Sequence, residues 1–436
     1  MICNYRRCTS RNFKKLFSTT SVWKEKHCCK LLIIGGGTAG CNIAHRFSRI
    51  LRPNDIIIVE PSEVHYYQPD FTFVGAGVKK LRDTLKATIQ VLPDKAIWLK
   101  DEVTELCPHV NSAITKKGDI IEYEFMILAV GLELCIGKVK GLAEAFEESR
   151  NVCTIYSPKY VEKSFRCLKD FARGVAVFTC PKTPTKCFSA SLKICFLAED
   201  YFRRNDKVCE AHILFCTGLR RTIPVECYEE VILKVVKRKK IDLHIRTNLI
   251  EVQPDKNTAI FQCLDNPGET IKMEYNMLHV TPPMGSANVL RNCKELSNKY
   301  GYADVNPNTL QHKKYPNVFA IGDCTPGITN KTSSAIGVQS IIVYQNLLSV
   351  VRGKPPKMHY DGYTACPVVT GYGTCILAEF DYKNNACESL PWKQNSESRL
   401  NYYLKKDVLG KLYWKYSVKG RNTFNRSLLR MFKLRR

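Results

Sequence analysis

The first 24 residues contain no aspartate or glutamate, although six lysines and arginines and six serines and threonines occur among them. A segment that is basic, rich in hydroxyl groups and free of acids is typical of a mitochondrial transit peptide. The same segment has no apolar stretch of the length that a secretory signal needs. We therefore expect residues 1–27 to be a cleaved leader of a mitochondrial protein, with a disordered basic tail as the alternative.

Long apolar runs are also missing from the chain. No run of 18 or more consecutive apolar residues occurs in it. We therefore expect no transmembrane helix, and any contact with a membrane should be interfacial.

A regular cysteine framework is absent, although the chain has 21 cysteines. With 436 residues, of which 44% are hydrophobic, the chain is long enough to form two or three domains without disulfides. We expect most thiols to be reduced and buried. Cys209, His212 and Cys216 have the spacing of metal ligands, but they fall on an expected strand and would not converge, so no metal site is predicted.

The first strand expected in the chain is the apolar segment Lys30–Ile34, and a glycine-rich loop, Gly35–Gly40, follows it directly. A helical pattern then leads to a second apolar strand, Ile56–Val59, which ends at Glu60. This strand–loop–helix–strand unit is the fingerprint of a dinucleotide-binding fold.

Each glycine of the fingerprint has a physical task. Gly35 makes the tight turn, Gly37 lets a pyrophosphate approach the backbone, and Gly40 allows the helix to pack closely on the strand. The phosphates lie at the helix N-terminus, where free N–H groups and the helix dipole favour anions. Glu60 is placed to accept hydrogen bonds from a ribose 2′-hydroxyl, which favours FAD or NAD over NADP.

Two further apolar strands that end in glycine, Glu124–Gly131 and Asn317–Asp323, decide between FAD and NAD. Asn317–Asp323 resembles the second FAD motif of the pyridine nucleotide–disulfide oxidoreductase superfamily, and Glu124–Gly131 resembles the intervening motif of that superfamily, where the chain crosses between domains. The resemblance implies that the cofactor is FAD and that Asp323 binds its ribityl chain.

The segment Thr179–Cys187 contains no glycine. It follows Val175–Phe178, the strand that should open a second dinucleotide-type domain, at the place where NADH-using relatives have a second glycine motif. Prolines and bulky side chains in this segment would block the approach of a pyrophosphate. We therefore expect no nicotinamide site, and the electrons should come from another donor.

Two cysteines are candidates for receiving those electrons. Cys187 ends the glycine-free loop, and Cys366 lies in Asp361–Tyr372, after the flavin domain. Two cysteines over a flavin can exchange thiolate and disulfide states with a sulfur nucleophile. With these segments the chain resembles the eukaryotic mitochondrial sulfide:quinone oxidoreductases over roughly residues 28–416. Further matching segments are His65–Pro69, Val74–Gly77, Asn248–Val252, Met277–Met284, Thr309–Thr325 and Leu377–Tyr382.

The resemblance implies a reaction and a set of residues. Hydrogen sulfide would attack the Cys187–Cys366 pair and leave a persulfide on Cys366, and the Cys187 thiolate would donate to FAD. Ubiquinone would receive the two electrons, and glutathione or sulfite would receive the sulfane sulfur. The implied flavin contacts are Thr38, Ala39, Glu60, Gln68, Val103, Asp323 and Ser333.

Residues near the two cysteines add expectations of their own. We expect Lys186 to favour the Cys187 thiolate and Lys331 to support negative charge on the reduced flavin, with solvated surface lysines as the alternative. Phe188 departs from the small residue that the family has after its first cysteine, so it would narrow access or tilt the loop. Nearby cysteines are expected to be buried thiols: Cys180, Cys195, Cys324 and Cys375.

The expected fold is α/β, with two Rossmann-like domains and a C-terminal region at the membrane interface. The FAD domain should be discontinuous, formed by residues 28–140 and 278–355. Residues 141–277 should form the second Rossmann-like domain without a nicotinamide motif. Residues 356–436 should carry the second redox cysteine and basic amphipathic helices.

The tail from Asn401 to Arg436 contains eleven lysines and arginines and a single acid, Asp407, and the chain has a net charge of +25. Aromatic residues are interleaved with these cations, which is typical of helices that lie on anionic lipid. We expect peripheral binding to inner mitochondrial membrane lipid, where a quinone would be collected. A solvated tail and a nucleic-acid surface are the alternatives, and no nucleic-acid motif accompanies the tail.

Three other functions remain open from the sequence. A type II NADH:quinone dehydrogenase shares the FAD motifs, the quinone and the membrane tail, but it should have the second glycine motif. A flavoprotein with a binding role, similar to apoptosis-inducing factor, should also have a nicotinamide site. A diverged and weakly active paralogue is the third, because of Phe188.

Overall fold

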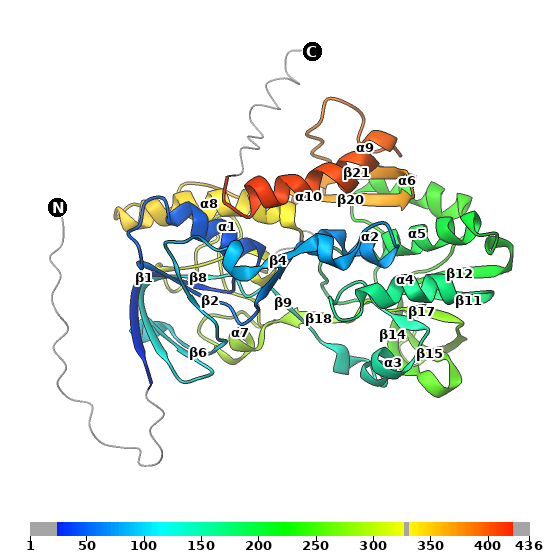
Figure 1. The fold of residues 1–436 in the computed structure, drawn as a ribbon, viewed down its shortest axis with the longest axis horizontal. Helices are drawn as coiled ribbons and strands as arrows, with labels where there is room; N and C mark the ends of the chain where they lie inside the picture. Colours follow the sequence, from blue (N-terminus) through cyan, green and yellow to red (C-terminus); the bar gives the residue numbers. More distant parts are fainter. Residues whose placement is uncertain (1–23, 327–330, 422–436) are drawn as a thin grey trace.

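The computed structural model describes residues 24–326 and 331–421 of the 436-residue chain. Most of the expected leader and the last part of the basic tail lie outside the described residues. Figure 1 shows two α/β lobes side by side, with a C-terminal helix and a β-hairpin laid across their upper side.

The first lobe is built on a sheet with the strand order β5-β2-β1-β8-β7-β6, and β19 also pairs with β8. Its central strands are parallel and consist of buried apolar residues, as a sheet covered on both faces requires. Its strands are β1 (Lys26–Ile34), β2 (Ile56–Val59), β5 (Ile97–Leu99), β6 (Val103–Cys107), β7 (Ser112–Thr115), β8 (Ile120–Leu128) and β19 (Val318–Ala320).

The start of β1 differs from the sequence expectation. The apolar run predicted a strand from Lys30, and the composition of the N-terminal segment placed residues 1–27 in the leader. In the structure β1 begins at Lys26, because its first residues pair with the long strand β8 from Ile120 onward. Backbone pairing therefore extends the strand through polar residues that hydrophobic periodicity does not detect.

The second lobe is built on a five-stranded parallel sheet with the order β10-β17-β11-β12-β13. A three-stranded antiparallel sheet, β14-β15-β16, packs beside it. The strands are β10 (Val152–Cys153), β11 (Gly174–Cys180), β12 (Ala211–Thr217), β13 (Asp242–His244), β14 (Thr247–Gln253), β15 (Thr258–Cys263), β16 (Thr270–Glu274) and β17 (Met277–His279). The helices of this lobe are α3 (Leu142–Glu148), α4 (Val161–Asp170), α5 (Ala190–Arg204) and α6 (Glu226–Arg238). The predicted α/β fold with two dinucleotide-type units is confirmed.

The chain crosses between the lobes where β9 (Leu132–Leu134) pairs with β18 (Met284–Ser286) in antiparallel fashion. A hairpin of β20 (Thr364–Gly371) and β21 (Thr374–Phe380) follows the first lobe in sequence but packs on α5 of the second lobe. The hairpin therefore carries residues that follow the first lobe in sequence to the edge of the second lobe. Smaller elements are β3 (Val64–Tyr66), β4 (Leu85–Ala87), α2 (Phe71–Gly75) and α7 (Asn288–Asn292).

Helix α8 (Ser333–Val351) packs beside α1 (Thr38–Phe47) on the first lobe (Figure 1). Among the described residues it is one helix that is long and apolar enough to cross a membrane by length and composition. Serine, glutamine and asparagine interrupt its apolar residues, so it contains no run of 18 consecutive apolar residues, and the expectation of no transmembrane helix stays a prediction. Ile342, Val343 and Leu347 of α8 are buried, so this face belongs to the core of the lobe.

The C-terminal helix is a continuous helical stretch from Arg399 to Ser417, made of α9 (Arg399–Tyr403), α10 (Leu409–Leu412) and two π-helical turns, Leu404–Val408 and Tyr413–Ser417. Its inner side is polar: Asn401, Lys405 and Tyr413 are buried against the protein. Its outer side exposes Leu400, Tyr403 and Leu412. The predicted tail helix is thus present and docked, with apolar side chains on its outer side.

Candidate active site

The glycine-rich loop leaves β1 at the edge of the first sheet where the carboxyl ends of β1, β8 and β19 meet. Gly35 has φ +100°, and a Cβ there would lie 2.5 Å from the carbonyl oxygen of Ala129. A Cβ on Gly40 would lie 1.8 Å from the carbonyl oxygen of Gly35, whereas nothing lies within 4 Å of the Cβ position of Gly37. Gly35 and Gly40 are therefore required for packing, and Gly37 leaves the loop backbone open to a ligand.

Glu60 holds this loop from the end of β2. Its carboxylate accepts hydrogen bonds from the backbone N–H of Gly36 at 2.7 Å and of Ser62 at 2.8 Å. Burial raises the pKa of Glu60 above its ordinary value, and the two N–H donors act in the opposite direction. Thr38 and Ala39 begin α1 directly after Gly37, and the side chain of Ala39 is buried.

The turn that carries Asp323 packs against the start of α1. A Cβ on Gly322, which has φ +81°, would lie 3.3 Å from the Cβ of Ala39. The backbone N–H of Gly322 donates to Oε1 of Gln339 on α8 at 2.8 Å. The structure thus brings the first and last predicted FAD segments together, with Ser333 at the beginning of α8.

Lys331 joins this turn to the loop that carries Cys187. Its ammonium donates to the carbonyl oxygens of Asp323 at 2.7 Å and Thr325 at 3.0 Å, and burial lowers its pKa. Its own carbonyl accepts a hydrogen bond from the backbone N–H of Cys187 at 3.1 Å. Lys331 is therefore a half-buried structural link between the two segments and not a solvated surface lysine.

Cys187 and Cys366 are brought into contact although 179 positions separate them in the sequence. Their sulfurs lie 3.5 Å apart, a contact of two thiols that is longer than the bond of about 2.05 Å in a disulfide. Cys366 is fully buried on β20, and the hydroxyl of Ser189 also contacts its sulfur. Cys187 has φ +46°, a conformation that is costly for a residue with a side chain and that is concentrated at functional sites.

A buried lysine that the sequence reasoning did not select completes the pair. Lys193, one turn into α5, donates from Nζ to the sulfur of Cys187 at 3.2 Å, and its side chain is buried. The hydrogen bond from Cys366 is the largest influence that lowers the pKa of Cys187, and Lys193 adds to it through its charge. The pKa of Cys366 is raised by the same hydrogen bond and by burial. The Lys193 ammonium beside Cys187 therefore favours the negative charge of the reduced pair on Cys187 rather than on Cys366.

The expectation that Lys186 supports the thiolate was wrong. The Lys186 ammonium lies 3.4 Å from Oε1 of Gln68, and its pKa is lowered by burial. The side chains of adjacent residues in a loop point in different directions, so Lys186 does not face the sulfur of Cys187. Helix α5 begins at Ala190, and its first turn places the side chain of Lys193 beside that sulfur. The spacing of six residues between Cys187 and a lysine on a helix would have been a usable signal.

Two other predicted flavin contacts occupy different surroundings. Gln68 is exposed and is linked to the cysteine loop through Lys186. Val103 begins β6 and is buried in the same apolar cluster as Ile34 and Val59, the last residues of β1 and β2. Gln68 thus lies at the surface beside the cysteine loop, where it could contact a ligand between the lobes. Val103 is part of the apolar core of the first lobe.

The additional cysteines behave as small apolar residues. All four that were expected to be buried thiols are buried, and burial raises the pKa of each of them. They are Cys180, Cys195, Cys324 and Cys375. Phe188 is half-buried against the core of the second lobe. In residues 24–326 and 331–421, no group of three or more histidine, cysteine and acidic side chains is arranged to hold a metal ion.

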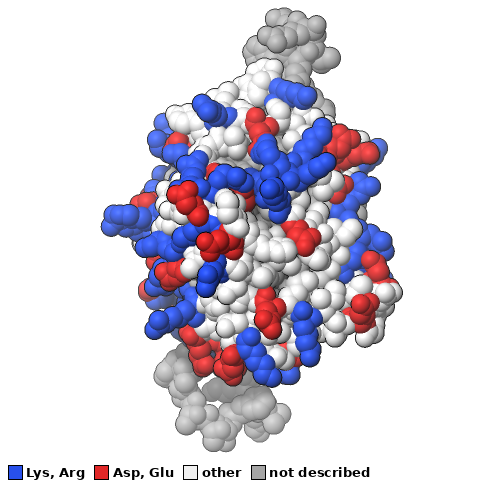
Figure 2. Space-filling view, turned by 90° about the vertical axis from the view of Figure 1, so that its right-hand side faces the viewer, with Lys and Arg blue, Asp and Glu red and all other residues white. Residues whose placement is uncertain are grey.

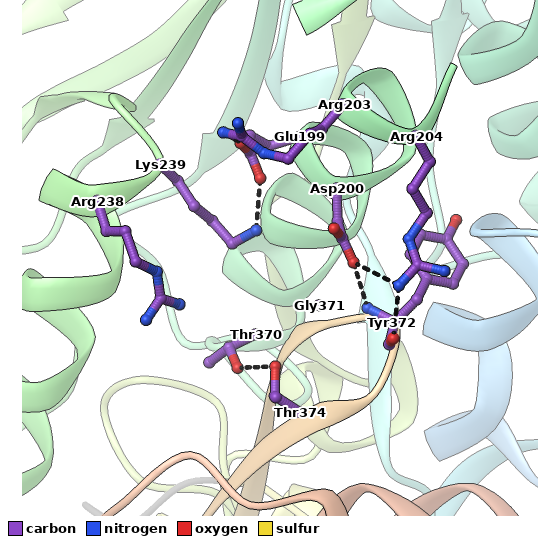
Figure 3. Close-up of a pocket in the computed structure, with 10 residues that line it drawn as sticks. All are labelled: Glu199, Asp200, Arg203, Arg204, Arg238, Lys239, Thr370, Gly371, Tyr372 and Thr374. Atoms are coloured by element: carbon purple, nitrogen blue, oxygen red, sulfur yellow. Dashed lines mark hydrogen bonds and ion pairs between the residues drawn. The ribbon is translucent and has the colours of Figure 1, made fainter. Parts of the chain in front are cut away.

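A cavity of about 440 Å³ lies at the other end of α5, away from the cysteines (Figure 3). Four cations line it: Arg203, Arg204, Arg238 and Lys239. Each cation is paired with an acid. Arg203 and Lys239 bind Glu199, Arg204 binds Asp200, and Arg238 binds Glu397. This cluster joins α5, α6 and the β20–β21 turn, and its four cations share three acids.

The surface charge follows a similar pattern at this end of the molecule. Figure 2 shows basic side chains gathered above the middle of the face, with acidic side chains among them. The excess of positive charge in the sequence is therefore interspersed with acids here and does not form an uninterrupted basic surface.

No protein-family model matches the chain, but several known proteins similar to it in sequence share one name. The mitochondrial sulfide:quinone oxidoreductase of Mus musculus is 42% identical over 90% of this chain and 86% of the mouse protein. The protein of the same name from Dictyostelium discoideum is 38% identical over 91% of this chain and 88% of its own length.

A solved structure gives the same result for the fold. The crystal structure of the sulfide:quinone oxidoreductase from Aquifex aeolicus superposes with a TM-score of 0.77 at 17% identity, and it covers 93% of this chain and 95% of the bacterial one. The identities to the mouse and Dictyostelium proteins extend over nearly the whole length of both partners. The chain therefore belongs to the family of mitochondrial sulfide:quinone oxidoreductases.

Proposed function

We propose that this protein oxidises hydrogen sulfide at the Cys187–Cys366 pair and passes the electrons through FAD to ubiquinone. The observation that carries the proposal is the contact of the two sulfurs at 3.5 Å, with the Lys193 ammonium 3.2 Å from Cys187. Two thiols and a buried cation in a family of sulfide:quinone oxidoreductases fit a dithiol–disulfide cycle. Neither the NADH dehydrogenase nor the binding flavoprotein is favoured by the relatives.

The first step begins from the oxidised pair. Hydrosulfide attacks the sulfur of Cys366, a new S–S bond forms there, and the bond to Cys187 breaks. The products are a Cys366 persulfide and a Cys187 thiolate, so the single negative charge of hydrosulfide is conserved. Lys193 stabilises the departing thiolate, and the free N–H groups at the start of α5 favour the same charge.

The second step removes the sulfur. A thiolate or sulfite anion attacks the outer sulfur of the persulfide, and Cys366 leaves as a thiolate. We propose glutathione or sulfite as this acceptor, because both are sulfur nucleophiles. Closing the Cys187–Cys366 disulfide then releases two electrons.

The described residues fit FAD as the acceptor of these electrons. The open backbone at Gly37 admits a pyrophosphate, Glu60 lies at the end of β2 for a ribose, and Asp323 packs beside the start of α1 for the ribityl chain. FAD bound there would accept two electrons from the cysteines and deliver them to the quinone. Gln68, Lys331 and Ser333 are the further residues that we propose to line its site.

The C-terminal helix supports a place at the inner mitochondrial membrane. Leu400 is 48% exposed, Tyr403 54% and Leu412 37%, and the exposed lysines Lys411 and Lys415 lie on the same helix. Apolar side chains flanked by cations fit a surface of anionic lipid, from which a water-insoluble quinone is collected. Vesicles containing cardiolipin should therefore bind the protein more strongly than neutral vesicles.

Anaerobic mixing of the purified, FAD-loaded protein with sulfide tests the proposal. Sulfide should bleach the flavin absorbance, and a soluble ubiquinone analogue should restore it. Cys187→Ser and Cys366→Ser should abolish bleaching, whereas Cys209→Ser, at an exposed thiol outside the site, should not change it. An oxidised flavin after sulfide, together with bleaching by NADH, would contradict the proposal and favour the NADH dehydrogenase.

A further inference from the structure

Tyr413 connects the C-terminal helix to the glycine-rich loop. Its side chain is only 4% exposed, although it comes from the basic tail of the sequence. Its hydroxyl lies 2.8 Å from Oγ1 of Thr38 and 2.6 Å from Nε2 of His65. Both partners belong to the dinucleotide-binding unit, and more than 340 positions separate them from Tyr413.

The direction of these hydrogen bonds follows from the state of His65. Burial lowers its pKa to about 4, so the imidazole is neutral at physiological pH. Its Nδ1 lies 3.3 Å from the carbonyl oxygen of Gly36, and since a carbonyl oxygen only accepts, Nδ1 carries the ring proton. Nε2 is then the acceptor, Tyr413 donates to it, and the Thr38 hydroxyl donates to Tyr413.

The bonds form a closed chain that begins and ends on the loop. It runs from Thr38 to Tyr413, from Tyr413 to His65, and from His65 back to Gly36. The thiol of Cys41 donates to the same Gly36 carbonyl at 3.0 Å. The loop has little side-chain material of its own to hold it, so these external bonds restrict its backbone.

Neighbouring contacts keep the Tyr413 hydroxyl in place. The ring of Tyr413 lies 4.5 Å from that of Tyr67 and 5.0 Å from that of Trp414, measured between centroids. One turn along α1 from Thr38, the Asn42 side chain donates to the carbonyl oxygen of Ser417. The C-terminal helix is therefore attached to α1 at two successive turns.

We propose that Tyr413 is a positioning residue for FAD, because it holds the loop in the conformation that receives the pyrophosphate. The C-terminal helix then contributes to cofactor retention as well as to the proposed contact with lipid. The inference rests on the proposed FAD site at Gly35–Gly40. A loop that is fixed before binding loses less conformational freedom when the ligand arrives, which increases affinity.

The test is the dissociation constant of FAD, measured by adding FAD to apoprotein and following the quenching of its fluorescence. Tyr413→Phe should weaken FAD binding about tenfold, the effect of losing one or two ordinary hydrogen bonds. Tyr403→Phe makes the same chemical change on the outer side of the helix, where the ring is 54% exposed, and should leave the dissociation constant unchanged. The melting temperature of each apoprotein shows whether the variants fold.

A double-mutant cycle separates positioning from general stabilisation. If Tyr413 acts through the loop, Tyr413→Phe combined with Thr38→Val should weaken FAD binding by less than the product of the single effects. An unchanged dissociation constant in Tyr413→Phe, or fully independent effects in the double variant, would overturn the inference. Failure of the unsubstituted protein to bind FAD would instead refute the proposed function.

Discussion

Lys193 is the residue at which a single substitution should most clearly change the chemistry of the cysteine pair. Its ammonium lies 3.2 Å from the sulfur of Cys187; Lys193 is buried, and Cys187 is half-buried. A hydrogen bond to a charged group contributes about 1.5–3 kcal/mol, which corresponds to roughly a 10- to 100-fold change in an equilibrium. Lys193→Met keeps the length of the side chain and removes the charge.

In Lys193→Met we expect the ratio of thiolate to thiol at Cys187 to fall at neutral pH by roughly 10- to 100-fold. The pKa of Cys187 is held below its ordinary value by Cys366, Lys193 and Ser189, so loss of Lys193 raises it. The thiolate should then return as the pH increases. The rate of alkylation of the reduced protein by iodoacetamide, measured across pH and located by mass spectrometry, reports this directly.

Two matched variants complete the assay. Lys193→Arg retains the charge and should preserve most of the reactivity at neutral pH. Lys186→Met removes the lysine that precedes Cys187 in sequence. Because Lys186 contacts Gln68, this change should leave the pH profile of Cys187 alkylation unchanged. The reasoning fails if Lys193→Met alkylates with the unaltered pH profile, or if Lys186→Met produces the larger shift.

Three further predictions concern the cofactor site, the pH dependence of stability and the C-terminal helix. Gly40→Ala places a Cβ 1.8 Å from the carbonyl oxygen of Gly35 and should destabilise the apoprotein in urea. Gly37→Ala has open space at its Cβ, so it should leave apoprotein stability unchanged and abolish FAD binding. Equal stability of the two variants would contradict this expectation. Burial lowers the pKa of His279 to about 3 in the folded protein, so as the pH falls the unfolded chain takes up a proton at this residue before the folded protein does. The unfolding free energy therefore decreases below the unfolded pKa of about 6.5, by up to about 1.4 kcal/mol per pH unit. His279→Gln should therefore flatten the decline in unfolding free energy between about pH 6 and 4, and an unaltered slope would refute the assignment. Lys405→Met removes a buried ammonium 3.0 Å from Asp70, which keeps its ion pair with Lys79, and should cost about 1.5–3 kcal/mol of unfolding free energy. Lys411→Met, on the exposed side, should cost nothing measurable.

The dinucleotide-binding unit could be predicted because its information is local. Hydrophobic runs, the three glycines and Glu60 lie within 31 positions of one another, from Lys30 to Glu60. Strand β2 falls where the pattern placed it, whereas α1 begins at Thr38, within the glycine loop rather than after it. The glycine-free loop at Thr179–Cys187 was equally visible, because its chemistry depends on which residue types are present. The proposed domain boundaries and flavin contacts remain predictions.

The environment of the cysteines was less accessible to sequence reasoning. The two cysteines were selected by resemblance, but the cation beside Cys187 was misassigned to Lys186. Lys193 reaches the sulfur because α5 begins three residues after Cys187 and its first turn brings the buried Lys193 side chain back over the loop. That choice depends on where a helix starts, and α5 starts beside the strand β20 that carries Cys366.

The sequence by itself therefore determined the α/β fold, the flavin-type loop, the lack of a second glycine motif and a basic aromatic tail. These properties depend on short-range periodicity and on residue types, which the linear chain carries. Only the tertiary structure decided that Cys187 meets Cys366, that Lys193 faces the thiolate, and that Tyr413 of the tail closes a hydrogen-bond chain on the glycine loop. Each of these contacts joins elements that are placed by burial of different core residues, so no local pattern encodes them.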